Sequence, residues 1–123
     1  MPLLNRDKSE EEIKLQEDWF AVRRFVKRNF DKRPDINAIL FLIGMNEVGI
    51  VKEEFEKEEK QDLMHVAICT IFEPDGYFEH EYTDRDGWPH FNATKKLPKI
   101  HLKEQESLLK QKIVDYFKKN QYI

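Results

Sequence analysis

The stretch that decides the fold is DINAILFLIGMNEVG, residues 35–49. Its interior is apolar on nearly every side, while Asp35 can cap the first turn of a helix and Gly49 can end the last one. A buried β-strand would carry a similar apolar run, but the length of the stretch and its two flanking signals favour a helix. The sequence therefore predicts a central, mostly buried helix that ends at about Val48.

An amphipathic helix is predicted upstream of this stretch, ending at about Phe30. Ser9 and Glu12 form a capping box at its start, and Arg33-Pro34 stops it. Apolar residues recur along it at helical spacing and form a stripe that faces the core. This stripe consists of Leu15, Trp19, Val22, Val26 and Phe30, widened by Ile13, Phe20 and Phe25.

Downstream, a third helix is expected from about Lys57 to Phe72, because Glu73-Pro74-Asp75-Gly76 is a strong turn signal. Most of its faces are apolar. The residues left for a narrow polar stripe are Asp62, His65, Cys69 and Glu73. A last helix is expected from about Lys103 to Asn120, after Leu97-Pro98.

Between these two helices, residues 77–94 are predicted to form a β-hairpin around the turn Asp84-Arg85-Asp86-Gly87. A two-residue loop would pair Tyr82 with Phe91, and a four-residue loop would pair His80 with Phe91. Both registers place His80, Tyr82 and Phe91 on one face. The predicted fold class is therefore α+β, mainly α, with about four helices packed with one hairpin.

The length of 123 residues predicts a single globular domain over residues 1–123, with residues 1–8 as candidates for disorder. The start lacks a basic segment followed by an apolar one, and the longest apolar run is far too short to span a bilayer. Cys69 is the only cysteine, which fits a reducing compartment. We therefore expect a cytoplasmic protein that does not enter a membrane.

The net charge is only −3, but the charges are distributed unevenly. Residues 47–87 are mainly acidic, whereas residues 23–33 and 95–119 are mainly basic. Such regions can attract each other within one chain or between two chains. In the basic part of the first helix, Arg24, Lys27 and Arg28 share one face, so this end of the helix is also a candidate surface for phosphate contacts.

His65 and Cys69 are the candidate metal ligands. They lie four residues apart and therefore on one helix face, where a carboxylate from Asp62 or Glu73 could join them. Imidazole and thiolate suit zinc, but no CxxC or HExxH spacing is present. The alternative interpretation is an ordinary polar stripe on a buried helix.

The hairpin supplies the candidate catalytic residues, Glu79, Glu81 and His90. Two carboxylates beside an imidazole can bind a divalent cation or perform acid and base chemistry, although a solvated sheet face has the same composition. Trp88 follows the turn and is a candidate contact residue, with hairpin packing as the alternative.

No nucleophile elbow, P-loop or dinucleotide-binding motif occurs in the sequence. The leading hypothesis is a non-enzymatic protein-interaction or structural domain that self-associates, with a homodimer suspected and Trp88, Arg24 and Arg28 as contact residues. One alternative is a metal-dependent or acid/base enzyme that uses the hairpin carboxylates and histidines. The other is nucleic-acid binding through the basic end of the first helix. No cofactor or small-molecule ligand is predicted, and binding of a divalent metal is kept as an alternative.

Overall fold

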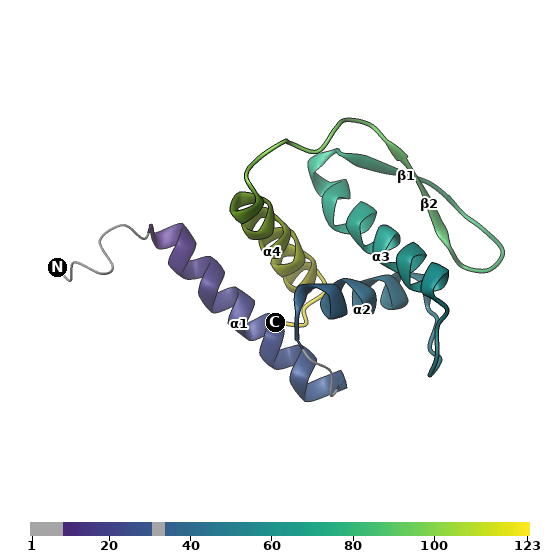
Figure 1. Cartoon of the computed structure of the whole chain (residues 1–123), viewed down its shortest axis with the longest axis horizontal. Coiled ribbons are helices and arrows are strands. Elements are labelled where there is room, and N and C mark those ends of the chain that lie inside the picture. The colour runs from purple at the N-terminus through teal and green to yellow at the C-terminus, as the bar shows by residue number, and fades with distance from the viewer. Residues whose placement is uncertain (1–8, 31–33) are drawn as a thin grey trace. The chain divides into compact units, whose positions relative to one another are not determined.

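The computed structural model describes residues 9–30 and 34–123. This part of the chain contains four α-helices and a two-stranded antiparallel hairpin between the third and fourth helices, which confirms the predicted, mainly helical fold class (Figure 1). In chain order the elements are α1 (Glu10–Phe30), α2 (Ile36–Val48), α3 (Lys57–Phe72), the short 3-10 helix η2 (Glu73–Asp75), β1 (Phe78–Thr83), β2 (Pro89–Ala93) and α4 (Leu102–Lys119). The expected disorder of residues 1–8 concerns residues outside the described part.

The chain divides into two compact units. The helical unit comprises Met1–Pro34 and Leu102–Ile123 and contains α1 and α4, whereas the hairpin unit, Asp35–His101, contains the other elements. The expectation of one domain over residues 1–123 stays a prediction. None of the described helices combines the length and the apolar character that crossing a membrane requires.

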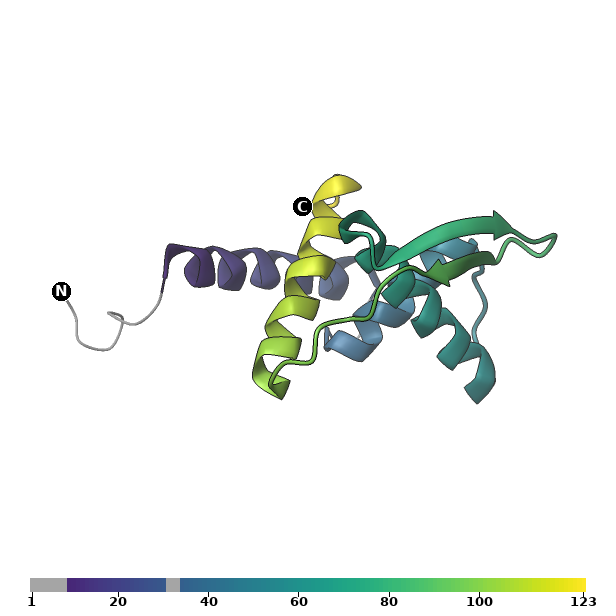
Figure 2. The ribbon, with the colours of Figure 1, turned by 90° about the horizontal axis from the view of Figure 1, so that it is seen from above.

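In the helical unit, α4 crosses α1 (Figure 2). The backbone N–H of Glu12 donates to Ser9 Oγ at 3.1 Å, as the predicted cap requires. The rings of Phe25 and Phe117 meet edge to face at 5.7 Å, and an ion pair between Lys118 Nζ and Asp18 Oδ2 at 2.8 Å also joins the two helices. The buried side chains of the two helices are Val22, Val26, Ile113, Val114, Tyr116 and Phe117.

The predicted core stripe of α1 is too wide. Ile13, Phe20 and Phe30 are 42 %, 56 % and 48 % exposed. At about 100° per residue, Ile13 and Phe20 point about 160–180° away from the buried Val22, so they lie on the opposite side of the helix. Phe30 is the last residue of α1. The helix therefore buries a narrow stripe and leaves a second apolar strip exposed.

In the hairpin unit, the local signals act as predicted. The carboxylate of Asp35 accepts the N–H of Ala38 at 2.8 Å, and Gly49 ends α2 in the left-handed conformation with φ +80°. The helices α2 and α3 approach each other closely at Gly44, where an added Cβ would lie 2.1 Å from the carbonyl oxygen of Leu63. The core cluster consists of Val48, Leu63 and Val66, covered by Phe41, Met45, Ile50, Phe55 and Trp88.

The hairpin register agrees with the four-residue-loop alternative at one pair and departs from it nearer the tip. His80 pairs with Phe91, but a register shift at Glu81 then pairs Tyr82 with His90. The prediction that Tyr82 shares the face of Phe91 is therefore wrong. The extra residue at the bulge moves the side chains beyond it to the opposite face of the hairpin, so Tyr82 lies on the face of His90. Outside the strands, a carboxylate oxygen of Glu73 accepts the N–H of His80 at 2.9 Å and holds this edge of β1.

Candidate functional site

The tip of the hairpin is organised by one carboxylate, that of Asp84. Its Oδ1 accepts the backbone N–H groups of Asp86 at 2.9 Å and Trp88 at 3.0 Å, while Oδ2 lies 2.8 Å from Nε2 of His90. The hydrogen bond from His90, followed by the one from Trp88, holds the pKa of Asp84 below its ordinary value. Asp84 is thus kept ionised and built into the turn.

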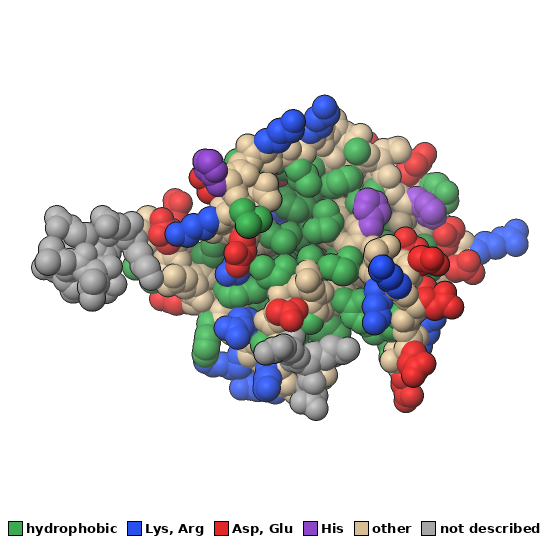
Figure 3. Space-filling view, in the orientation of Figure 1, with side chains coloured by type: hydrophobic (Ala, Val, Ile, Leu, Met, Phe, Trp, Pro, Cys, Tyr) green, Lys and Arg blue, Asp and Glu red, His purple; other side chains and the backbone are tan. Residues whose placement is uncertain are grey.

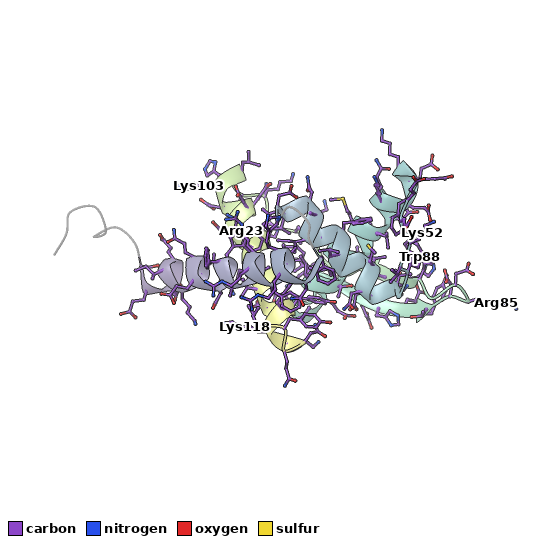
Figure 4. All side chains as sticks on the ribbon, turned by 90° about the horizontal axis from the view of Figure 1, so that it is seen from below. Arg23, Lys52, Arg85, Trp88, Lys103 and Lys118 are labelled. Carbon is purple, nitrogen blue, oxygen red and sulfur yellow. The ribbon has the colours of Figure 1, made fainter. Side chains whose placement is uncertain are left out.

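The imidazole of His90 has a second neighbour. It stacks on the ring of Tyr82 with a centroid distance of 4.5 Å and an interplanar angle of 5°. Because Asp84 holds one edge of the imidazole and Tyr82 covers one face, the ring has a fixed orientation on the hairpin. Nearby, Arg85 extends away from the tip (Figure 4).

The three predicted catalytic residues, Glu79, Glu81 and His90, have different neighbours in the structure. Glu79 lies opposite Asn92, Glu81 occupies the bulge, and His90 contacts the carboxylate of Asp84. Within residues 9–30 and 34–123, no three His, Cys, Asp or Glu side chains are arranged to hold a metal ion. The sequence signal for the pair that does form is the Asp at the start of a turn, six residues before a histidine.

The predicted metal ligands His65 and Cys69 do contact each other, with Nε2 and Sγ 3.6 Å apart. Cys69 is fully buried, however, so the predicted polar stripe on α3 is wrong at this position. Burial raises the pKa of the Cys69 thiol to about 11, which keeps it protonated near neutral pH. Of the two expected carboxylates, Glu73 accepts the N–H of His80, and Asp62 is exposed to solvent.

The indole of Trp88 is partly buried and packs against the cluster of Val48, Leu63 and Val66. This is the arrangement that the packing alternative describes. In the view of Figure 4, Trp88 lies among the helices of the hairpin unit, unlike Arg85.

The helical unit presents a surface that we call the outer face of α1. Its basic end is expected from the sequence, but the exposure of Ile13 and Phe20 is not, because both are assigned to the core stripe. All residues of the outer face are exposed. They are Glu10, Ile13, Glu17, Phe20, Arg24, Lys27 and Arg28. The guanidinium carbon of Arg24 lies 4.8 Å from the centroid of the Phe20 ring. The signal that identifies this face is the seven-residue spacing of Ile13 and Phe20, with a cation one turn after Phe20.

The charges along this outer face are ordered. The first half carries the carboxylates of Glu10 and Glu17, on either side of Ile13. Phe20 lies at the middle, and the second half carries three cations, those of Arg24, Lys27 and Arg28. When the same face of a second copy runs in the opposite direction, its cations lie opposite these carboxylates, so the two faces are electrostatically complementary.

The two units also differ in charge. The hairpin unit has fourteen acidic and seven basic residues, a net charge of −7, whereas the remaining sequence has ten and fourteen, a net charge of +4. Acidic side chains gather around the start of α3 and the loop before it (Figure 3). No protein-family model, curated protein or solved structure matches this chain.

Proposed function

We propose that this chain is a non-enzymatic protein-interaction domain that self-associates as a homodimer. The observation that supports this proposal is the exposure of Phe20 and Ile13, at 56 % and 42 %, on one face of α1. Removing a phenylalanine side chain from water contributes about 1.5–3 kcal/mol when burial is complete. A partner that covers this face therefore gains free energy that the isolated helical unit leaves unused.

The charges support association with a copy of the same chain. One face carries carboxylates in its first half and cations in its second half, so two such faces can satisfy each other. Exposed ion pairs contribute only about 0–1 kcal/mol each, and salt screens them. We therefore expect a dimer of modest affinity that weakens as ionic strength rises.

Sedimentation equilibrium of the purified protein, from low to high micromolar concentration, tests the proposal. The expected average mass rises above 14.9 kDa and approaches twice that value. A mass of 14.9 kDa at every concentration would refute self-association. Native mass spectrometry of the same sample reports bound species, and a stoichiometric metal ion would favour the enzyme alternative.

Nucleic-acid binding is a second candidate, because Arg24, Lys27 and Arg28 are exposed together on α1. It predicts that a labelled oligonucleotide binds with a steep salt dependence and that the double variant Arg24→Glu with Arg28→Glu abolishes binding. If the oligonucleotide does not bind at low salt, this candidate is excluded.

A further inference from the structure

We infer that two copies of this chain associate through the outer faces of α1, which lie antiparallel about a two-fold axis that passes close to Phe20. This inference rests on the proposed self-association and specifies its surface and geometry.

The position of Phe20 supports a two-fold arrangement. Residue 20 is the midpoint of α1, which runs from Glu10 to Phe30. When two copies of such a helix lie antiparallel with full overlap, each residue meets the one equally far from the midpoint on the second copy. Phe20 then meets Phe20 of the second copy, and Ile13 meets the aliphatic stem of Lys27.

The spacing of these residues keeps them in line. Ile13, Phe20 and Lys27 recur every seven residues. Residues at this spacing stay on the line of contact, here called the seam, when one helix packs along another. A helix of 21 residues is about 30 Å long, so the seam extends over about six turns. An interface of this kind falls at the small end of specific protein contacts, in agreement with a modest affinity.

The charges select the antiparallel direction. Glu17 and Arg24 are also seven residues apart and lie on one flank of the seam. In an antiparallel pair, flanking residues on the same side face each other. Glu17 lies three residues before the midpoint and Arg24 four residues after it, so each Glu17 lies within about one residue rise, about 1.5 Å along the axis, of Arg24 of the second copy. A parallel two-fold pair would place the two equal flanks on opposite sides of the contact line, so neither contact between Glu17 and Arg24 of the second copy would form. The guanidinium of Arg24 is already held at the apolar seam by its contact with the Phe20 ring.

The test is a charge exchange followed by sedimentation equilibrium. In Glu17→Arg alone, and in Arg24→Glu alone, both attractive pairs of the homodimer become repulsive pairs. We expect the dissociation constant of each variant to rise about tenfold or more. In an equimolar mixture, the new arginine of one variant faces the new glutamate of the other, and the second pair keeps its native residues. The mixture should therefore regain about the wild-type affinity as a heterodimer.

Two further variants on the exposed surface of α4, Glu104→Arg and Lys119→Glu, change the net charge by the same amounts and serve as matched controls. They should leave the dissociation constant nearly unchanged. Phe20→Ser should weaken the dimer as well, and circular dichroism verifies that each variant folds.

The outcomes separate this inference from the proposed function. A wild-type protein that stays monomeric refutes both. A wild-type dimer that Phe20→Ser and both charge variants leave unchanged overturns the α1 interface and leaves self-association standing. A dimer that Phe20→Ser weakens but a charge variant does not, or a mixture that fails to recover, overturns the antiparallel geometry.

Discussion

Replacing Gly44 by alanine should destabilise the hairpin unit, because this glycine allows α2 and α3 to approach each other. An added Cβ would lie 2.1 Å from the carbonyl oxygen of Leu63, 2.7 Å from its carbonyl carbon and 3.0 Å from its Cβ. Two of these atoms belong to the backbone in the interior of α3, and Leu63 itself is fully buried. Neither atom can rotate away, so the helices must separate by about 1 Å to restore ordinary van der Waals contact.

The magnitude follows from two opposing effects. Overpacking a close contact costs about 1–3 kcal/mol, and a clash with backbone belongs at the upper end of that range. Alanine is favoured over glycine within a helix by about 1 kcal/mol. We therefore expect the free energy of unfolding to fall by about 2 kcal/mol after the two effects are combined.

Urea unfolding monitored by circular dichroism and tryptophan fluorescence measures this change, since Trp88 packs on the cluster that contains Leu63. Gly49→Ala is the matched control: an added Cβ there contacts nothing within 4 Å, and the cost comes only from a backbone φ of +80°. That cost is about 1 kcal/mol. The reasoning is refuted if Gly44→Ala equals the wild type in stability or loses less than Gly49→Ala.

Two further predictions concern titratable groups. The pKa of Asp84 is lowered in the folded state, so its ionised form stabilises the hairpin at neutral pH, and this stabilisation disappears as the pH falls through the folded-state pKa. The melting temperature of Asp84→Asn should thus depend less on acidic pH than that of the wild type, and parallel curves would contradict this. The pKa of Cys69 is raised from 9.0 to about 11. The raised pKa alone lowers the thiolate fraction about a hundredfold, and burial of Cys69 slows its reaction further. Native protein should therefore react with a thiol reagent at neutral pH at least about a hundredfold more slowly than urea-unfolded protein, and equal rates would show an accessible thiolate.

The helices of the hairpin unit could be predicted from sequence, because each boundary depends on a signal a few residues away. Asp35 caps the helix that it precedes, and Gly49 ends that helix with its own backbone. The turn after α3 likewise depends on adjacent residues, and Gly76 takes a positive φ of +81° there. Such features are determined by the chemistry of residues close in sequence and need no knowledge of the tertiary contacts.

The hairpin register and the helix crossing could not be predicted in the same way. Alternation of side chains fits several registers, and the bulge at Glu81 lies between two contacts made by residues outside the strands. The carboxylate of Glu73 accepts the N–H of His80 before the bulge, and Asp84 fixes the tip beyond it. In the sequence, Gly44 is recognisable only as a glycine inside an apolar helix. This observation suggests a close contact but does not identify Leu63 as the residue that approaches it.

The outer face of α1 shows why a core residue and a contact residue are hard to distinguish by periodicity. Helical spacing identifies apolar positions, but the width of the buried stripe depends on how much surface packs against the helix. Val22 and Val26 are buried, whereas Ile13 and Phe20 are left exposed on the other side. These two apolar residues do not pack in the chain's own core. The charges on the same face are acidic before Phe20 and basic after it, so they complement the charges of a second copy that runs in the opposite direction. This complementarity favours a second copy as the partner that covers the face.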